Sequence, residues 1–217
     1  MLFRSIALLA LLLATLFPAA PLAAQALPDK YQAGKHYFLI EPPQPTSSGN
    51  KVEVVEVFSY GCIHCAHFQP TVDEWKKKMP AGASFSYMPA FFQPTFALFG
   101  RAYYTAEVLG VAEKAHQDLF KAIFVEQKPL HSMDDIANWY AQYGVKADDF
   151  VKTATSFAVE TKVNRANQLV KNYNVDGTPT IVVAGKYRVT GASAEGYDKV
   201  FDVVNFLVAK ELSQPKK

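Results

Sequence analysis

Short runs of apolar and β-branched residues mark the strands that this sequence predicts. Val52–Phe58 is a nearly continuous run, which is typical of a strand buried on both faces. Phe85–Met88 is a second run, while Thr180–Val183 and Tyr187–Thr190 are separated by a short turn and predict a hairpin. A short edge strand is expected near Tyr37–Ile40, within a proline-rich arm. The pattern therefore predicts a sheet whose strands come from both ends of the chain.

Apolar residues at helical spacing predict helices between and after these strands. The first helix follows the Val52–Phe58 strand, contains Pro70, and ends at Pro80 and Gly82. Two more amphipathic stretches, over residues 159–173 and 197–208, flank the predicted hairpin. The apolar face of the first helix consists of Phe68, Val72, Trp75 and Met79.

Residues 94–157 interrupt this alternation, because they contain helical periodicity and no convincing strand. Ser132 to Asp135 is a capping-box pattern that predicts a helix start, and Gly144 supplies a stop. The stretch is dense in aromatic residues, which we expect in a helical core rather than on a substrate-binding surface. These aromatics are Phe96, Phe99, Tyr103, Tyr104, Phe120 and Phe124. The sequence thus predicts an α/β domain in two parts, residues 27–93 and 158–217, with an inserted all-helical domain over residues 94–157.

The first 26 residues have the pattern of a secretory signal peptide. Arg4 precedes the apolar run Ile6–Phe17, which is too short for a comfortable transmembrane helix. Small residues follow, and the pattern places cleavage after Ala26 or Ala24. The alternative is an uncleaved N-terminal anchor. We therefore expect an exported protein.

Charge and cysteine content narrow the possible functions. The net charge of the whole chain is +2, which provides no electrostatic footprint for nucleic acid. The chain has only two cysteines, Cys62 and Cys65. Cysteines of exported proteins usually form structural disulfides, but a bridge between residues this close restrains little of the unfolded chain. The pair is therefore expected to carry chemistry.

Cys62 lies where a buried strand gives way to a helix. A helix start presents unpaired N–H groups and a partial positive charge, and both favour a thiolate; a protonated His64 would add to them. We expect Cys62 to be an exposed nucleophile and Cys65, one turn later, to resolve mixed disulfides. The alternative is a zinc site that recruits His64, His67 or His36, but the chain has no second pair of cysteines. We expect no metal and no cofactor.

Two further positions are candidates for the site. Glu56 shares a strand face with Val54 and Phe58, where a carboxyl group is costly unless it has a task or a partner. The alternative is a solvated glutamate on an irregular strand. Thr178-Pro179 directly precedes a predicted strand, where proline cannot donate to a sheet. A cis bond there would place the Thr178 backbone beside the thiols to pair with an extended substrate; the alternative is an ordinary trans proline.

In combination these motifs resemble the thioredoxin fold, and the helical insertion resembles the DsbA family of bacterial periplasmic oxidants. The resemblance runs through residues 56–65 and again through residues 175–187, and it covers essentially the whole chain after the signal peptide. Four positions depart from the best-studied pattern. Ile63 stands where many members carry proline, Gln69 where an acid is often found, Gly82 where a lysine is expected, and Thr178 where the strongest oxidants have valine.

The resemblance implies a periplasmic thiol:disulfide oxidoreductase that donates its Cys62–Cys65 disulfide to newly exported proteins with free thiols. It also implies a cis Thr178-Pro179 bond, assistance by Glu56 in proton transfer at the second cysteine, and reoxidation by a DsbB-like membrane quinone reductase. We expect a monomer. One alternative is a disulfide reductase or isomerase on the same scaffold, although isomerases of this type usually dimerise through a separate domain that is not evident here. The other is a non-catalytic peptide-binding chaperone or a metal-binding module.

Overall fold

The centre of the fold is β2 (Val52–Phe58), a strand whose residues are all buried. The computed structural model describes residues 30–214, so the predicted signal peptide over residues 1–26 lies outside the described part. β2 has the bounds predicted from its run of β-branched residues. Its burial on both faces explains why that run does not alternate between apolar and polar residues. The strand leads directly into the turn before Cys62.

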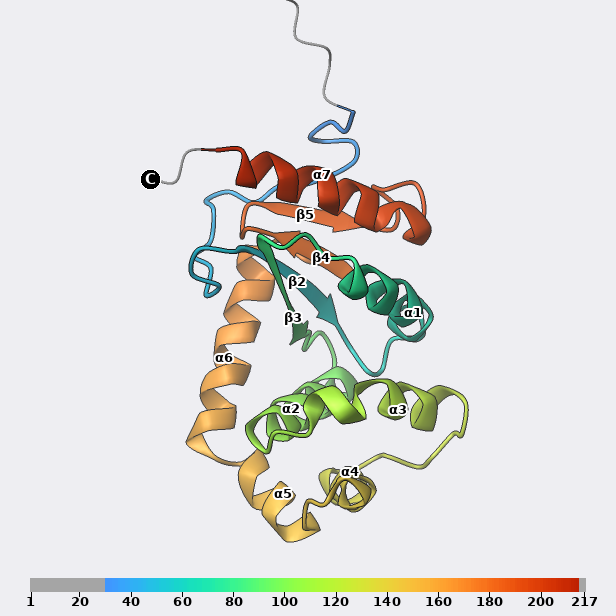
Figure 1. The fold of residues 1–217 in the computed structure, drawn as a ribbon. Helices are drawn as coiled ribbons and strands as arrows, with labels where there is room; N and C mark the ends of the chain where they lie inside the picture. The colour runs from blue at the N-terminus through green and yellow to red at the C-terminus, as the bar shows by residue number, and fades with distance from the viewer. Residues whose placement is uncertain (1–29, 215–217) are drawn as a thin grey trace, which may run out of the picture. The chain divides into compact units, whose positions relative to one another are not determined.

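The strands form one mixed sheet in the order β1-β5-β4-β2-β3 (Figure 1). β3 (Ala83–Pro89) pairs with β2 in parallel, and β4 (Thr180–Val183) pairs with the other side of β2 in antiparallel. β5 (Tyr187–Thr190) completes the hairpin, and β1 (Phe38–Leu39) lies at the edge. β4 and β5 have the predicted bounds, whereas β3 extends beyond its predicted run at both ends. The strand that carries Glu56 therefore lies between two neighbours.

Helices cover both faces of this sheet (Figure 1). α1 (Ile63–Lys77) and α7 (Val200–Leu212) share a core with Val54 on one face. On the other face, α6 (Phe157–Asn172) packs against Val55. These layers match the order of strands and helices that the hydrophobic pattern predicts.

The ends of two helices differ from the prediction. α1 ends at Lys77, so Met79 lies after the helix although it still packs against the same core. Pro80 accounts for this, because a proline disfavours helical backbone at the residue before it. The closing helix begins with a short 3₁₀ turn, Tyr197–Lys199, before α7 starts at Val200.

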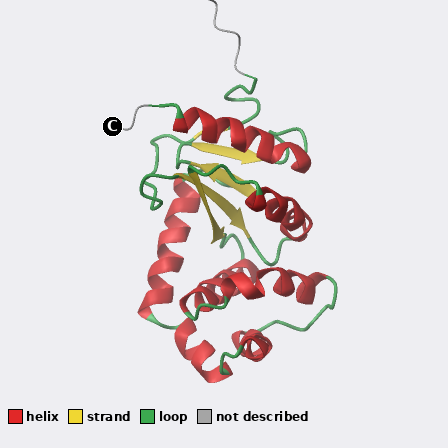
Figure 2. Cartoon of the chain, viewed as in Figure 1, coloured by secondary structure: helices red, strands yellow, loops and turns green. Residues whose placement is uncertain are grey.

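The inserted helices are α2 (Pro94–Val108), α3 (Ala112–Phe124), α4 (Met133–Tyr140) and α5 (Ala147–Ala154). Figure 2 shows no strand among them. Pro94 occupies the first turn of α2, where a missing N–H has no cost. The predicted boundary after residue 157 falls at the first residue of α6, which starts beside α5 and continues onto the sheet (Figure 1).

The inserted helices share a core with the end of the α/β layer that carries the two cysteines. Phe58, Tyr60 and Cys65 belong to the same apolar cluster as Leu119 and Ile136. The predicted helical core is confirmed: the aromatics of residues 94–124 are buried, apart from Phe124, which is partly buried. The insertion therefore supports the thiol site directly.

α4 begins with the capping box that the sequence predicts. The Ser132 hydroxyl accepts a hydrogen bond from the Asp135 N–H at 3.1 Å, and the Asp135 carboxylate accepts one from the Ser132 N–H at 2.9 Å. Gly144, with φ of 85°, ends the following 3₁₀ helix, Ala141–Tyr143, in the left-handed region that favours glycine. Local signals alone therefore specify this part of the insertion.

Replacement of the capping serine tests this assignment. Ser132→Ala should lower the free energy of unfolding by about 1 kcal/mol, because it leaves the Asp135 N–H at the start of α4 without its partner. Urea denaturation followed by circular dichroism measures the change. Ser213→Ala, at the C-terminal end of α7, is the control and should change stability by much less. Equal effects of the two substitutions would contradict the capping role.

Candidate active site

Cys62 is the N-cap residue of α1. Its backbone is extended, with φ of −104° and ψ of 112°, and its carbonyl accepts hydrogen bonds from the N–H groups of Cys65 (3.1 Å) and Ala66 (3.2 Å). No side chain caps this helix, and its first turn has no acidic residue. The positive end of the helix is therefore unopposed at the Cys62 sulfur.

The two thiols are both free, and they differ sharply in environment. Cys62 is partly exposed, whereas Cys65 is completely buried. The pKa of Cys62 is lowered to about 5, mainly by a hydrogen bond from the Cys65 thiol. The Thr178 side chain and the backbone N–H groups of Cys65 and His64 contribute to this lowering, while burial of Cys62 opposes them. Burial raises the pKa of Cys65 well above its usual range, helped by its hydrogen bond to Cys62 and by the charge of Glu56. Only one of the two sulfurs is thus suited to be an anion.

Thr178-Pro179 lies directly beside this pair. The peptide bond between the two residues is cis, as predicted. The Thr178 carbonyl accepts a hydrogen bond from the Cys62 thiol at 3.3 Å. This contact favours the thiol, while the Thr178 side chain favours the thiolate and lowers the pKa of Cys62. Thr178 can therefore form a hydrogen bond with Cys62 whether the cysteine is a thiol or a thiolate. The thiolate is favoured overall because the Cys65 thiol and the backbone N–H groups of Cys65 and His64 also donate to the sulfur.

Glu56 is buried in the middle of β2, with 1% of its surface exposed. Neither carboxyl oxygen has a hydrogen-bond partner among the residues that the structure describes. Burial is the main cause that raises the pKa of Glu56 well above its usual range; the negative charges of Asp73 and Cys62 raise it further, and Lys76 partly offsets them. The alternative of a solvated glutamate is therefore wrong.

Known proteins similar to this chain share its length and its fold. Residues 97–199 match the family described as DSBA-like thioredoxin domain. The thiol:disulfide interchange protein DsbA of Pseudomonas aeruginosa is 39% identical over 196 residues, which cover 90% of this chain and 92% of that protein. DsbA of Pseudomonas syringae pv. tomato is 38% identical over 207 residues, or 95% of each chain. The chain belongs to the DsbA family.

Solved DsbA structures agree with this assignment. A crystal structure of a Pseudomonas aeruginosa DsbA variant superposes with a TM-score of 0.82 at 38% identity, and it covers 85% of this chain and 100% of that one. DsbA from Xylella fastidiosa gives a TM-score of 0.79 at 36% identity, over 83% of this chain and 97% of the other. The predicted thioredoxin fold with a helical insertion is confirmed, and the protein is a thiol:disulfide oxidoreductase.

His64 lies in the first turn of α1, two residues after Cys62. Its ring is stacked on Tyr197, with 6.3 Å between the ring centroids. Its backbone N–H is the group that contributes to the lowered pKa of Cys62. The predicted effect of a positive charge on the His64 ring stays a prediction. His64, His67 and His36 do not gather into a metal site, since residues 30–214 contain no cluster of three or more suitable ligands.

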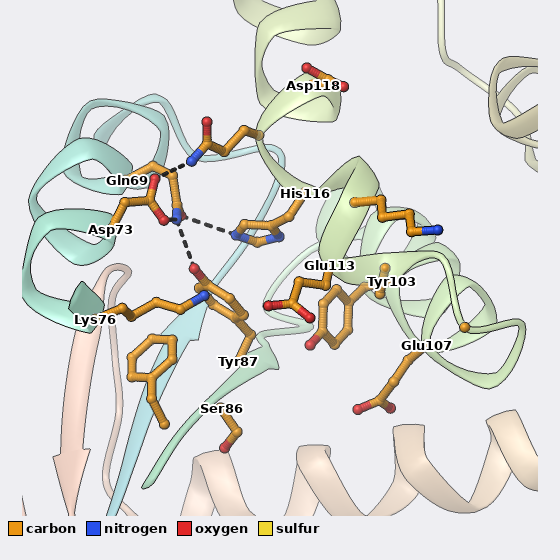
Figure 3. Close-up of a pocket in the computed structure, with 15 residues that line it drawn as sticks. Gln69, Asp73, Lys76, Ser86, Tyr87, Tyr103, Glu107, Glu113, His116 and Asp118 are labelled. Atoms are coloured by element: carbon orange, nitrogen blue, oxygen red, sulfur yellow. Dashed lines mark hydrogen bonds between the residues drawn. The ribbon is translucent and has the colours of Figure 1, made fainter. Parts of the chain in front are cut away.

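Sequence reasoning missed a polar network behind the thiols of this DsbA (Figure 3). His116, from α3, accepts or donates at Tyr60 (2.7 Å) and at Gln69 (3.0 Å). The Gln69 amide donates to the Tyr87 hydroxyl at 2.7 Å and to Asp73 at 3.1 Å. One signal could have revealed it: Gln69 and His116 interrupt the apolar stripes of their helices and are nevertheless buried.

The asymmetry of the thiols predicts a specific alkylation pattern. Iodoacetamide should label Cys62 of the reduced protein first, at a rate whose pH profile has its midpoint near the Cys62 pKa of about 5. Mass spectrometry of the digested protein identifies the labelled cysteine. Cys65→Ala should move the midpoint upward because it removes the main hydrogen-bond donor to Cys62. Cys65→Ser retains a donor and should move it less. Preferential labelling of Cys65 would overturn the assignment.

Proposed function

We propose that the oxidised Cys62–Cys65 pair is the disulfide that this DsbA donates to exported proteins, and that Cys62 is the sulfur that substrates attack. The difference between the two thiols supports this most directly. A thiol of low pKa is a good leaving group. The mixed disulfide between Cys62 and a substrate is therefore easily broken by the second substrate thiol, which leaves the disulfide in the substrate. Stabilisation of the reduced form in this way makes an enzyme oxidising, which is the general behaviour of DsbA proteins.

The reaction proceeds in two exchanges. A substrate thiolate attacks Cys62, the bond to Cys65 breaks, and Cys65 leaves as a thiolate that takes a proton. The second substrate thiolate then attacks the substrate sulfur of the mixed disulfide, and Cys62 leaves as the stabilised thiolate. The substrate loses two electrons and two thiol protons, and the enzyme pair gains the two electrons.

Glu56 is proposed to supply the proton that Cys65 needs. The Cys65 thiol is buried, and its own pKa is raised by the charge of Glu56, so the two groups lie within electrostatic range. A carboxyl group whose pKa is raised by burial retains a proton at a pH where an exposed glutamate has lost it. The acid therefore has a task that offsets the cost of its burial.

The surroundings of Cys62 suit an extended and apolar substrate segment. Thr178 and the cis bond to Pro179 lie against the Cys62 sulfur, where we propose that the backbone of Thr178 pairs with the substrate. Ile63, Phe92 and Tyr197 are large apolar side chains that remain at least 40% exposed. Unfolded proteins present both backbone and apolar side chains, and so they fit such a surface.

The cellular setting is proposed from the relatives and from the N-terminal pattern. The N-terminal pattern supports export through a signal peptide. The likeness to DsbA proteins supports a periplasmic setting and reoxidation by a DsbB-like membrane quinone reductase. Residues 30–214 contain no helix that is long and apolar enough to cross a bilayer. The test of the whole proposal is the redox equilibrium of the purified protein against a glutathione buffer. A site that stays oxidised only under strongly oxidising conditions supports a donor, and a site that is oxidised under mild conditions indicates a reductase or isomerase.

Glu56→Gln should slow the reaction without loss of the fold. We expect stopped-flow oxidation of a model dithiol peptide to be at least about tenfold slower, which is a modest share of the usual gain from general acid–base catalysis. Urea unfolding of the variant at neutral pH should show no loss of stability, because the substitution removes an acid with no hydrogen-bond partner. An unchanged rate would leave Glu56 without a catalytic role.

The reduced protein should be more stable than the oxidised protein at neutral pH. The folded pKa of Cys62, about 5, lies below the unfolded value of roughly 8.5. The stabilisation by the thiolate is therefore fully present above the unfolded pKa and is lost as the pH falls through the folded pKa. Urea unfolding of both redox forms between pH 4 and pH 9 measures the difference. Greater stability of the oxidised form would favour the alternative of a binding protein with an ordinary short disulfide.

A further inference from the structure

A cavity of about 710 Å³ lies behind the redox site, between α1, β3 and α3 (Figure 3). Gln69, Asp73 and Lys76 line it from α1, Tyr87 lines it from β3, and His116 lines it from α3. Neither cysteine borders the cavity, and the active-site surface around Cys62 opens elsewhere. The cavity is therefore a second connection between solvent and the interior of the α/β layer.

Tyr87 lines this cavity and lies on the strand next to Glu56. The two residues are paired in the parallel register of β2 and β3, so their side chains project from the same face of the sheet. The negative charge of Glu56 raises the pKa of Tyr87 further, after the larger effect of burial. Tyr87 is therefore a cavity-lining hydroxyl on the same sheet face as Glu56, and no hydrogen bond joins the two groups in the structure.

The hydrogen bonds of Gln69 determine the direction in which Tyr87 can donate. The Gln69 nitrogen donates to Asp73 and to the Tyr87 hydroxyl oxygen, at 3.1 Å and 2.7 Å. Asp73 can only accept when it is ionised, so this contact fixes the orientation of the amide. The Tyr87 oxygen then accepts a hydrogen bond from the Gln69 N–H, and the Tyr87 hydroxyl proton is available to another acceptor.

His116 holds Gln69 in this orientation. With the Gln69 nitrogen directed at Asp73 and Tyr87, its oxygen faces the His116 Nε2 at 3.0 Å and must accept a hydrogen bond from the Nε2–H. The His116 Nδ1 then accepts from the Tyr60 hydroxyl at 2.7 Å. Burial, with a smaller contribution from the charge of Lys76, lowers the pKa of His116 to about 3, so the ring stays neutral and acts as a fixed connector.

We propose that Tyr87 relays protons between Glu56 and the cavity, and that Gln69, held by His116, is the positioning residue that leaves the Tyr87 hydroxyl proton available to Glu56. This inference rests on the proposed role of Glu56 as the proton donor to Cys65. The charged and titratable groups around the relay are Asp73, Lys76, Cys62 and Cys65 from α1 and Glu113 and His116 from α3.

The proton balance of the cycle requires such a connection. When the Cys62–Cys65 bond breaks, Cys65 takes a proton from Glu56 and leaves a carboxylate in the interior. Tyr87 donates its hydroxyl proton to that carboxylate and receives one from water in the cavity, so the tyrosine itself never remains ionised. When the enzyme is reoxidised, Cys65 returns its proton to Glu56, and the relay runs in reverse.

The decisive variant is Tyr87→Phe, which removes the hydroxyl and keeps the ring. We expect single-turnover oxidation of a dithiol peptide to slow by about fivefold to tenfold, and the Glu56→Gln, Tyr87→Phe double variant to be no slower than Glu56→Gln alone. Tyr103→Phe is the matched control, because Tyr103 lines the same cavity from α2 and should retain the wild-type rate. Urea unfolding of each variant separates a lost relay from a damaged fold.

Imidazole provides a readout that a structural role would not change. The cavity is large enough to admit it, so added imidazole should restore the rate of Tyr87→Phe but not that of Glu56→Gln. Gln69→Glu should slow the reaction at neutral pH, because a carboxylate accepts the Tyr87 proton and turns it away from Glu56, and the rate should recover as the pH falls.

Two outcomes overturn the inference in distinguishable ways. If Glu56→Gln slows the reaction while Tyr87→Phe behaves like Tyr103→Phe, Glu56 exchanges its proton elsewhere, and the proposed function stands without the relay. If Glu56→Gln itself has no effect, the proposed role of Glu56 fails, and the relay fails with it.

Discussion

The hydrogen bond between the thiols of Cys62 and Cys65, at the start of α1, is the interaction on which the chemistry depends. It is the main cause of the low pKa of Cys62, and it adds to the larger effect of burial in raising the pKa of Cys65. The contact thus helps to separate a nucleophile from a proton-bearing leaving group. Helix geometry makes the contact possible. Cys62 is the N-cap residue, and Cys65 lies one turn later on the buried face. The unopposed N-terminus of α1 then favours the negative charge on the exposed sulfur rather than on the buried one.

This arrangement needs rigid support on all sides, and the core provides it at one junction. Cys62 packs against the cluster of the inserted helices and also against the cluster under α6, while Cys65 belongs to the first of these. Tyr87 joins the insertion cluster to the cluster beneath α1 and α7. The insertion thus contributes more than a cover over the sheet. It supplies His116, whose contacts with Tyr60 and Gln69 tie the turn before Cys62 to the middle of α1.

The sequence predicted the parts of this structure that local chemistry determines. The bounds of β2, β4 and β5 follow from β-branched runs ended by turn residues, and Ser132 and Gly144 mark the ends of their helical segment through caps that act within a few residues. The thiol pair was equally evident, because its spacing and its helix start are both local. The network of Tyr60, Gln69, Tyr87 and His116 was not, since it joins residues up to 56 positions apart and depends on how α3 packs against α1. The residue pattern of one helix does not reveal which polar residue of another helix will contact it in the fold.

Gln69 stands where many family members carry an acid, and the electrostatics around Glu56 explain why an amide suits this position. The negative charges of Asp73 and of the Cys62 thiolate already raise the pKa of Glu56, and the positive charge of Lys76 partly offsets them. An acid at position 69 would add a further like charge close to a carboxyl group that must lose and regain a proton. An amide avoids this repulsion and still bonds Asp73, Tyr87 and His116 at once, because it carries both a donor and an acceptor. The interior can then hold a transient Glu56 carboxylate at a lower electrostatic cost, while the low pKa of Cys62 remains determined by the donors at the helix start.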